Sequence, residues 1–376
     1  FLVMHIMHVI DSLQVGGAER MLVELANAVA SDGHRVSVCV TRSGMSLADD
    51  LSPAIPLHPL NRKRRFNFQA MRSFASIIRQ QGVDLLHVHG RTSLSFVATV
   101  KSLRLADVAV VFHDHYGRIE HDSKIPFWFR SWAKFQIDYY VGVYARLWDS
   151  AIAAGLPREQ VKVIDNALDL ERLRKIAATS EQQVYVNDDK RPLGVVVANL
   201  RPEKGIHLLL SALSKISGPQ PPWQIYIIGR DADSEYGKYC RKLTVELRIS
   251  DRVHFLGERT DVPAWIQAAD FAIIPSTSES GPLVLIEYMC LGIPFVATAT
   301  GSISKRVAEL GVPEIVRTND VDALSAAIER LLQLSKTERK ERGELGRTIA
   351  EQFFDIRCVL PQWYEVYESV LSQRQQ

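Results

Sequence analysis

Short apolar runs rich in β-branched residues alternate with longer amphipathic segments along this chain, and the alternation occurs twice. The amphipathic segments carry apolar residues at intervals of three and four, as a helix with one buried face requires. Unbroken apolar strands that alternate with helices indicate parallel sheets covered by helices on both faces. The sequence therefore predicts two doubly wound α/β domains in tandem. We expect strands at residues 5–11, 34–41, 83–89, 108–114, 139–143 and 161–165, and then at 192–200, 223–229, 252–257, 271–276 and 294–300.

A polar stretch over residues 181–192 separates the two alternations and is typical of a linker. We therefore expect a first domain at 1–165, an interdomain segment and linker at 166–192, and a second domain at 193–355. Ligands of doubly wound domains bind at the carboxyl ends of the strands, so we expect a site there, in the cleft between the two domains. The last residues, 356–376, predict a helix with an apolar stripe made by Trp363, Val366, Tyr367 and Val370.

Composition narrows the class of protein. Of the 376 residues, 47% are hydrophobic and 23% are charged, and the net charge is +2. This balance indicates a soluble protein with large cores and disfavours nucleic-acid binding. No run approaches the roughly 20 apolar residues that a membrane-spanning helix needs. The four cysteines have no metal-ligand spacing, so we expect reduced thiols in a cytosolic protein.

Gly16 and Gly17 follow the first expected strand and open the first expected helix. Glycine lets a ligand approach the backbone, and the free N–H groups of a helix start favour an anion. By itself, such a pair is more typical of a plain tight turn between a strand and a helix. The pair also lacks the G-x-G-x-x-G spacing of a dinucleotide site, which disfavours an oxidoreductase.

Arg201 and Lys204 leave the strand at 192–200 together, and Gly205 begins the next helix. Arginine offers a planar fork of donors and lysine a compact charge, so this pair suits a diphosphate. Two solvated surface cations fit the stretch equally well.

Glu279 and Glu287 lie eight positions apart around the start of a helix, which Pro282 opens. Side chains lean toward a helix N-terminus, so we expect both carboxylates to face the cleft, with helix N–H groups between them. One carboxylate would bind sugar hydroxyls and the other ribose hydroxyls of a sugar nucleotide whose diphosphate lies between. For this stretch alone, the alternative is an ordinary helix-start carboxylate and an exposed helical glutamate.

Four stretches together resemble glycosyltransferase family 4, a family of retaining enzymes with the GT-B fold and an E-x7-E motif. They lie at residues 16–20, 199–205, 255–276 and 278–298. The resemblance extends over nearly the whole chain. It implies two Rossmann-like domains that face each other across a cleft, with the C-terminal helix returning to the first domain.

The resemblance also implies roles for individual residues. Glu279 would bind hydroxyls of the donor sugar and Glu287 the ribose. Arg201 and Lys204 would hold the diphosphate, and His113 matches a histidine near the donor sugar. Catalytic roles thus fall on Glu279, Arg201, Lys204 and His113. The other implied donor-binding positions are Gly16, Gly17, Gly229, Ser280, Gly281, Pro282, Leu283, Glu258 and Arg259, with Glu258 and Arg259 near the base.

Pro282 departs from the family pattern, because many members have glycine there. Proline has no N–H, so one phosphate contact must be absent or shifted. The charge that builds on the departing diphosphate is the hard part of the reaction, and preorganised cations and N–H groups stabilise it. Glu279 is the only obvious nucleophile, and the resemblance assigns it to sugar hydroxyls. We therefore expect front-face attack, in which the leaving phosphate accepts the proton of the acceptor.

The implied reaction is transfer of a hexose or N-acetylhexosamine from a nucleotide diphosphate sugar, a UDP-sugar in preference to a GDP-sugar. The acceptor would be a glycan or lipid-linked molecule in cell-surface polysaccharide or glycolipid synthesis. The resemblance implies no metal and no cofactor beyond this co-substrate. One alternative is a GT-B nucleotide-sugar epimerase, which needs acid/base carboxylates that the motif does not supply. Another is a non-catalytic sugar-nucleotide-binding subunit, in which the motifs would be substituted.

Two further polar patterns carry weaker signals. Asp231 and Asp233 form a D-x-D after a strand, for which a solvated loop is a better interpretation than a metal site. His87 and His89 lie at a strand end, where satisfied polar groups are somewhat favoured over acceptor-binding residues.

Two segments in the net-positive first half of the chain suggest binding to a membrane surface. Residues 61–68 interleave four cations, at 62–65, with two phenylalanines. On a helix over 124–136, aromatic and apolar side chains form one stripe, although core packing explains such a stripe slightly better. We expect a cytoplasmic enzyme that binds the inner face of the plasma membrane through these segments. The stripe consists of Ile125, Trp128, Trp132 and Phe135.

Overall fold

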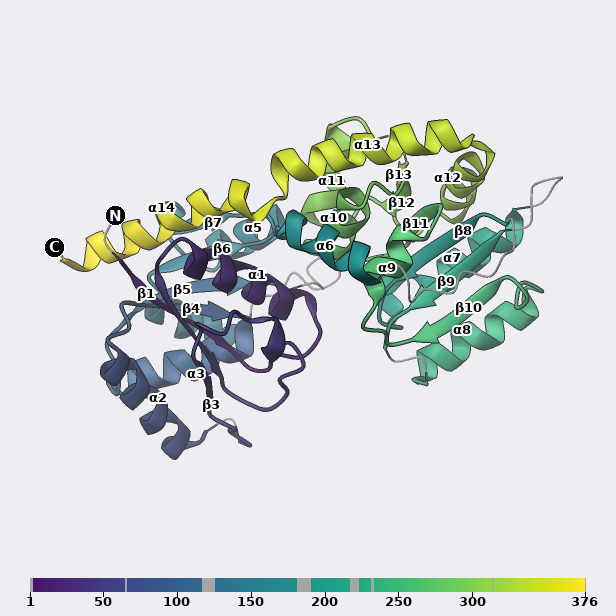
Figure 1. The fold of residues 1–376 in the computed structure, drawn as a ribbon. Helices are drawn as coiled ribbons and strands as arrows, with labels where there is room; N and C mark the ends of the chain where they lie inside the picture. Colours follow the sequence, from purple (N-terminus) through teal and green to yellow (C-terminus); the bar gives the residue numbers. More distant parts are fainter. Residues whose placement is uncertain are drawn as a thin grey trace. The chain divides into compact units, whose positions relative to one another are not determined.

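The structure is a computed structural model with two compact units (Figure 1). Unit 1 contains Phe1–Ala167 and Ile356–Gln376, and unit 2 contains Leu168–Asp355. The two crossings between the units lie side by side, because Leu168 N–H donates to Phe354 O at 3.1 Å. The structure describes residues 3–64, 66–116, 126–180, 191–216, 223–230, 233–312 and 314–375.

The segment expected at 166–192 does not lie wholly between the units. Helix α6 (Leu170–Ser180) packs against helices α9 and α10 of unit 2. Leu170, Leu173 and Ala177 enter the core of that unit, which explains why the segment belongs there. Residues 181–190 of the expected linker lie outside the described residues.

Unit 1 is built on a seven-stranded parallel sheet of order β3-β2-β1-β4-β5-β6-β7. The reversal of order between β1 and β4 marks a doubly wound sheet, as the sequence predicts. Strand β3 was not expected, because its three residues include a histidine and a proline and form no apolar run. The strands are β1 (His5–Ile10), β2 (Arg35–Val40), β3 (Leu57–Pro59), β4 (Leu85–His89), β5 (Ala109–Asp114), β6 (Tyr139–Gly142) and β7 (Val161–Val163).

Helices cover both faces of the unit 1 sheet. Helices α1 (Gly17–Ser31) and α14 (Ile356–Gln375) pack on one face, and α2 (Phe68–Gln81), α3 (Arg91–Ser102) and α5 (Ala145–Ala153) on the other. Asn67 caps α2 by accepting from Ala70 N–H, and Gly82 ends that helix in the left-handed conformation. The shorter helices are η1 (Ala48–Asp50), α4 (Phe127–Ser131), η2 (Ala133–Gln136) and η3 (Arg158–Gln160).

Unit 2 contains a six-stranded parallel sheet of order β10-β9-β8-β11-β12-β13. Its order also reverses beside the first strand, β8, so the two doubly wound sheets are confirmed, although the short edge strand β13 was not expected. The strands are β8 (Leu193–Val197), β9 (Gln224–Ile228), β10 (Val253–Gly257), β11 (Phe271–Ile274), β12 (Phe295–Thr298) and β13 (Ile315–Val316). The helices besides α6 are η5 (Pro202–Lys204), α7 (Ile206–Lys215), α8 (Glu235–Glu246), α9 (Val262–Gln267), α10 (Leu283–Cys290), α11 (Gly301–Glu309), α12 (Val321–Gln333) and α13 (Lys336–Phe353).

The C-terminal helix α14 returns to unit 1, as expected, and contacts α1 and β5. All four residues of its expected stripe are buried, at 0–2% exposure. Trp363 lies over the sheet with its ring centroid 4.6 Å from those of His87 and His113. The helix therefore closes one face of the unit 1 core through a few large side chains.

The prediction of one continuous helix over residues 124–136 is wrong. Helix α4 ends at Ser131, and Trp132, with φ of −144°, separates it from η2. Trp128 and Trp132 are half-buried against the unit 1 core, Phe127 and Phe135 are exposed, and Ile125 lies outside the described residues. None of the helices in the described ranges is long and apolar enough to cross a bilayer.

Replacement of Trp363 by alanine should lower the free energy of unfolding of unit 1 by about 3–5 kcal/mol, because it empties a large site in a closed core. Chemical denaturation followed by circular dichroism measures this change. Glu368→Ala, on the exposed side of the same helix, is the control and should shift stability by less than about 0.5 kcal/mol. Equal stability of the two variants would show that α14 does not close the core.

Candidate functional site

The carboxyl ends of the unit 2 strands are joined by hydrogen bonds between consecutive turns. Asn199, just after β8, accepts from Arg230 N–H at 3.0 Å through its side chain. Gly229 N–H donates to Gly257 O at 2.9 Å, which links the ends of β9 and β10. Glu258 lies 3.6 Å from Arg230 Nε in an exposed ion pair. Gly229 and Glu258, both expected at the donor site, thus lie at neighbouring strand ends.

Arg259 does not share this ion pair. Its guanidinium donates twice to Asp261, at 2.7 and 2.8 Å, and these hydrogen bonds lower the pKa of Asp261. Asp233, from the D-x-D pattern, is exposed, and Asp231 lies outside the described residues.

The turn after β8 carries Arg201 and Lys204 at the two ends of the short helix η5. Gly205 follows in the left-handed conformation, with φ of +65°. A Cβ atom at Gly205 would lie 2.0 Å from Pro275 O at the end of β11. Only glycine therefore allows this turn to approach the turn after β11 so closely.

Glu279 lies in the turn after β11 and is 8% exposed. Its Oε1 accepts from Lys204 Nζ at 2.6 Å and from Ser276 Oγ at 2.8 Å. Its backbone N–H donates to Thr300 Oγ1 at 3.1 Å, in the turn after β12. Three strand ends thus hold one buried carboxylate in a defined position.

Helix α10 begins directly after this turn. Pro282 is the residue before the helix, not its first residue as the sequence suggested, and Leu283 begins the helix. Glu287 is only 1% exposed, so it is not the exposed helical glutamate considered as an alternative. Ser280 and Gly281 complete the turn, and Ser302 N–H donates to Ser280 O at 2.7 Å. Both glutamates of the motif are therefore buried, on either side of the start of α10.

The glycine turn expected at the donor site lies in unit 1. Gly16 is extended, with φ of −167°, and its carbonyl accepts from Arg20 N–H at 3.0 Å as α1 begins. Gly17 is exposed, and a Cβ atom there would meet nothing within 4 Å. The backbone is therefore open to an approaching group at Gly17, whereas at Gly16 the Glu19 carboxylate lies 2.3 Å from where a Cβ atom would be.

His113 also lies in unit 1, within a group of five histidines that the sequence analysis did not recognise as a group. We call His8, His87, His89, His113 and His115 the histidine array. His8 pairs with His87 in the sheet register, and His89 pairs with His113, so three adjacent strands bring them together. Histidines two positions apart on one strand share a face, which was the signal available in the sequence.

Hydrogen-bond distances connect the ring nitrogens of the array. His8 Nδ1 lies 3.0 Å from His89 Nε2, and His89 Nδ1 lies 3.2 Å from His115 Nε2. His87 Nε2 lies 3.1 Å from His113 Nδ1. The fourth bond joins His87 Nδ1 to Tyr367 Oη of α14, at 2.7 Å. These contacts satisfy the polar groups at the end of β4, which was the favoured interpretation of His87 and His89.

Burial keeps the histidine array neutral. Desolvation lowers the pKa of His8 and of His115 to about 3. It also holds the pKa values of His87, His89 and His113 well below the usual value, and the neighbouring imidazoles add to the effect.

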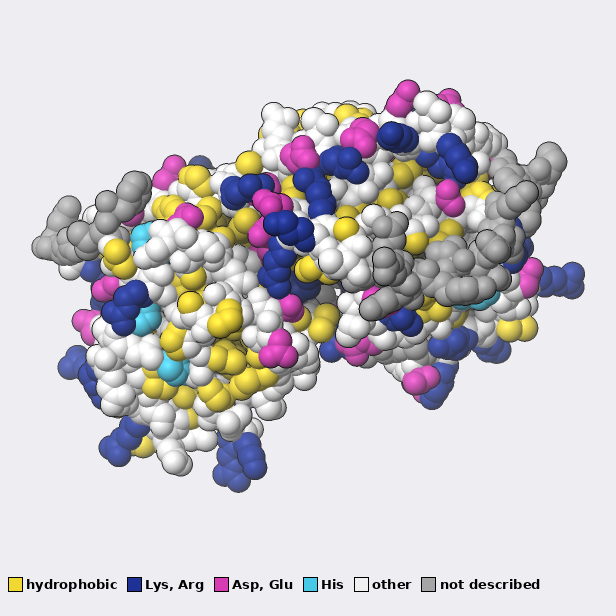
Figure 2. Space-filling view, in the orientation of Figure 1, with side chains coloured by type: hydrophobic (Ala, Val, Ile, Leu, Met, Phe, Trp, Pro, Cys, Tyr) yellow, Lys and Arg dark blue, Asp and Glu magenta, His cyan; other side chains and the backbone are white. Residues whose placement is uncertain are grey.

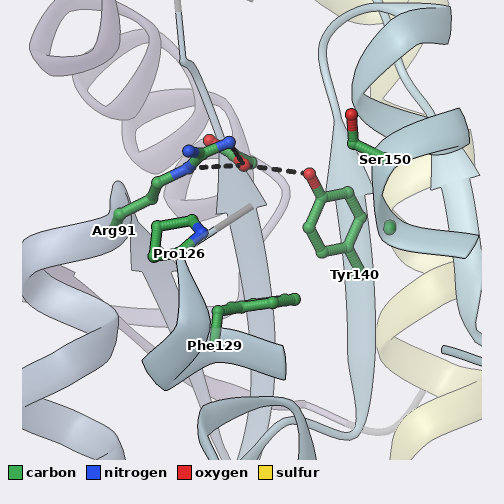
Figure 3. Close-up of a pocket in the computed structure, with 7 residues that line it drawn as sticks. Arg91, Pro126, Phe129, Tyr140 and Ser150 are labelled. Atoms are coloured by element: carbon green, nitrogen blue, oxygen red, sulfur yellow. Dashed lines mark hydrogen bonds and ion pairs between the residues drawn. The ribbon is translucent and has the colours of Figure 1, made fainter. Parts of the chain in front are cut away.

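A second polar cluster faces the other side of β5, around a small cavity (Figure 3). Asp114 Oδ2 accepts from Arg91 Nε and NH2, both at 3.1 Å, and from Tyr140 Oη at 2.9 Å. Burial and this carboxylate raise the pKa of Tyr140 well above its usual value, so its hydroxyl remains a donor. The cluster ties the end of β5 to α3 and β6, and the sequence analysis did not find it.

Comparison with known proteins gives one family model for each half of the chain. The model of Glycosyltransferase Family 4 matches residues 15–172, and that of Glycosyl transferases group 1 matches residues 178–348. N-acetyl-alpha-D-glucosaminyl L-malate synthase of Bacillus anthracis is 22% identical over 95% of each chain. Phosphatidyl-myo-inositol mannosyltransferase of Mycolicibacterium smegmatis is 25% identical over 94% of this chain and 90% of its own.

Solved structures share the fold over almost the full length. Anabaena HepE, in complex with UDP-glucose, matches with a TM-score of 0.81 and 21% identity over 97% of this chain and 100% of its own. A glycosyltransferase from Rickettsia africae matches with a TM-score of 0.80 and 17% identity over 99% of each chain. With a family model on each half and two parallel sheets of doubly wound order, this chain is a GT-B glycosyltransferase of the family 4 and group 1 type.

Proposed function

We propose that this chain is a retaining glycosyltransferase that moves a hexose or N-acetylhexosamine from a nucleotide diphosphate sugar to a glycan or lipid-linked acceptor. The observation that carries the proposal is the buried Glu279 carboxylate, paired with Lys204 at the carboxyl ends of β8 and β11. A second buried carboxylate, Glu287, lies on the helix that starts between them. Buried carboxylates at strand ends are disfavoured by desolvation unless a partner or a ligand needs them.

In this proposal the two glutamates bind opposite ends of the donor. Glu279 accepts hydrogen bonds from hydroxyls of the sugar, and Glu287 accepts them from the ribose. The backbone of Ser280, Gly281 and Leu283 donates to the phosphates between, where the helix dipole favours negative charge. Pro282 lacks an N–H and contributes only by fixing the turn.

Arg201 and Lys204 stabilise the charge of the departing diphosphate. A lysine ammonium has three donors, so Lys204 can keep its contact with Glu279 and still donate to a phosphate oxygen. These two cations supply the charge that the leaving group requires, so the proposed reaction places no metal on the diphosphate. Retention follows front-face attack, because Glu279 is engaged with the sugar and with Lys204.

The remaining roles follow the family resemblance. Gly16 and Gly17 are proposed phosphate contacts and His113 a proposed sugar contact of unit 1. In unit 2, Gly229 is a proposed donor contact, and Glu258 and Arg259 are proposed to lie near the base. UDP-sugar is the favoured donor, supported by the UDP-glucose complex of HepE, whose fold this chain shares. The relatives named above include enzymes of N-acetylglucosamine and mannose transfer, so the sugar class stays broad.

We also propose that the enzyme works in the cytoplasm, on the inner face of the plasma membrane, in cell-surface polysaccharide or glycolipid synthesis. Phe66 and Phe68 are 69% and 51% exposed, beside the exposed Lys63 and Arg64. On the face of unit 1 shown in Figure 2, separate Lys and Arg side chains stand around hydrophobic surface. Such a surface suits anionic lipid.

The expectation that Arg62 contacts the membrane is wrong, because this side chain is buried. Its side chain is 1% exposed, and its NH2 lies 2.8 Å from Asp11 Oδ1. Its Nε donates to Thr41 Oγ1 at 3.0 Å. Arg62 therefore holds the turns after β1 and β2 together, and Arg65 lies outside the described residues.

Alanine at Arg201 or at Lys204 should lower turnover by about two to three orders of magnitude, because each change removes one preorganised cation. Release of nucleotide diphosphate from a panel of UDP- and GDP-sugars measures it. Lys215→Ala, an exposed cation on α7, is the matched control and should keep full turnover. Normal turnover of either site variant would remove that residue from the diphosphate site.

The two glutamates should respond differently to replacement by glutamine. Glu287→Gln should raise KM and weaken binding of free UDP or GDP, since ribose contacts are alike in the ground and transition states. Glu279→Gln should mainly lower kcat, since it touches the sugar that reacts. Isothermal titration with the free nucleotide tests the first claim, and unchanged affinity of Glu287→Gln would end the ribose assignment.

Binding to anionic vesicles should depend on Lys63 and Arg64. Each cation near the surface contributes about 1 kcal/mol at low salt, so Lys63→Ser with Arg64→Ser should weaken binding about thirty-fold. Vesicle sedimentation measures this, with Lys238→Ser and Lys242→Ser on α8 as the charge-matched control. If the unaltered protein stays in the supernatant with anionic vesicles at low salt, the acceptor is better sought among soluble molecules.

A further inference from the structure

The histidine array contains a set of three histidines with the geometry of a metal site. We call His89, His113 and His115 the outer set. Each residue of this set can place one ring nitrogen within 4.8 Å of the others. The distance between His89 Nδ1 and His115 Nε2 is 3.2 Å. A tetrahedral ion with bonds of about 2.0–2.1 Å to nitrogen separates its ligand nitrogens by about 3.3 Å, so this pair already has the required spacing.

One nitrogen of the outer set is buried and has no protein partner. His113 Nε2 makes no hydrogen bond, and the residue is 1% exposed. A buried polar atom of this kind requires an explanation, because it loses its contact with water and gains none. An ion bound at this nitrogen would supply the missing contact.

In two members of the outer set, the ring nitrogen that would not bind the ion already has a hydrogen-bond partner. His89 uses Nε2 toward His8 Nδ1, at 3.0 Å. His113 uses Nδ1 toward His87 Nε2, at 3.1 Å, and His87 in turn bonds to Tyr367 Oη. Metal-binding histidines in proteins almost always have such a partner on the second ring nitrogen, which orients the ring and selects the tautomer.

Access from solvent also favours the outer set over the other histidines of the array as a site for an ion. His115 is half-buried, so an ion can reach it from solvent, whereas His8 and His87 are fully enclosed. His8, His87 and His89 also bring ring nitrogens within 4.8 Å of one another, but each of these residues is at most 1% exposed, so that set has no member open to solvent. Asp114 lies between two members of the outer set in sequence, but its carboxylate bonds to Arg91 and Tyr140 on the opposite face.

We propose that His89, His113 and His115 form a binding site for a divalent cation of the zinc class, with one ring nitrogen from each residue and a fourth position open. Three neutral imidazoles suit Zn²⁺, Co²⁺, Ni²⁺ or Cu²⁺. They do not suit Mg²⁺ or Ca²⁺, which prefer oxygen ligands. The site lies in unit 1 and uses none of the cations proposed for the donor diphosphate in unit 2. An ion on His113 Nε2 would take the place of the sugar contact that the family resemblance implies for His113, because Nδ1 of that ring is bonded to His87.

The test measures metal bound, not sugar transferred. The full chain without a polyhistidine tag is stripped with chelator, dialysed against micromolar Zn²⁺ and analysed for metal by mass spectrometry. A parallel titration with Co²⁺ follows the visible absorption of a low-coordinate cobalt site. We expect one equivalent of ion and visible cobalt bands in the unaltered protein.

Three variants locate the ion. His115→Asn and His89→Asn should each lose most of the bound metal, and His115→Asn is the safer variant because its side chain is half-buried. His58→Asn, on β3 in the same unit, removes a histidine outside the array and should keep one equivalent. Tyr367→Phe should weaken the affinity for the ion about ten-fold, because it removes the hydrogen-bond partner of His87, which in turn bonds to His113.

Circular dichroism confirms that each variant is folded before its metal is counted. The proposal is overturned if the folded, unaltered protein binds no ion at micromolar concentration. It is also overturned if folded His115→Asn binds as much ion as the unaltered chain, or if His58→Asn loses as much as His115→Asn. None of these outcomes depends on the donor or acceptor of the transferase reaction.

Discussion

The contact between Lys204 and Glu279 depends on the close approach of two turns. The two residues are 75 positions apart, yet their charged atoms lie 2.6 Å from each other. Gly205 permits the approach, because any side chain there would collide with Pro275 O. The parallel sheet places both turns at one edge, since β8 and β11 are neighbours that run in the same direction. Glycine and strand order together create the charge pair on which the proposed donor site rests.

The histidine array in unit 1 forms for the same reason, because neighbouring parallel strands place their residues side by side. Adjacent parallel strands β1, β4 and β5 contribute histidines in matching register, and α14 closes over them with Trp363 and Tyr367. Enclosure by this helix removes water from the imidazoles, so they remain neutral and bond to one another. The C-terminal helix therefore contributes to the burial that lowers the pKa values of His87 and His113, in addition to its packing role.

Charged residues in this protein divide into those that hold turns and those that face solvent. Arg62 and Arg91 look alike in sequence to the exposed cations around them, but each is paired with an aspartate at the end of a strand. Removing one partner of such a pair leaves a partly buried charge, which is costlier than losing an exposed cation. Mutational tests of charge at the surface therefore need Lys63 and Arg64 rather than Arg62.

Sequence alone determined the two doubly wound domains, the direction of their strands, and the stripe of the C-terminal helix. Hydrophobic periodicity is a local property, so it can be read without knowing the fold. The sequence also placed Arg201, Lys204 and Glu279 after strands, and Glu287 inside the helix that follows Glu279. The sequence did not reveal strands β3 and β13, the break at Trp132, or the place of α6 in unit 2, because these depend on neighbours distant in sequence.

Only the tertiary structure decided which polar groups meet. The pairing of Lys204 with Glu279, the burial of Glu287 and the Asp114 cluster each join segments from different turns or strands. The two H-x-H patterns, at 87–89 and 113–115, were visible in the sequence, but their convergence with His8 required the register of three strands. A sequence specifies which faces are apolar, whereas strand order and register decide which side chains lie within bonding distance.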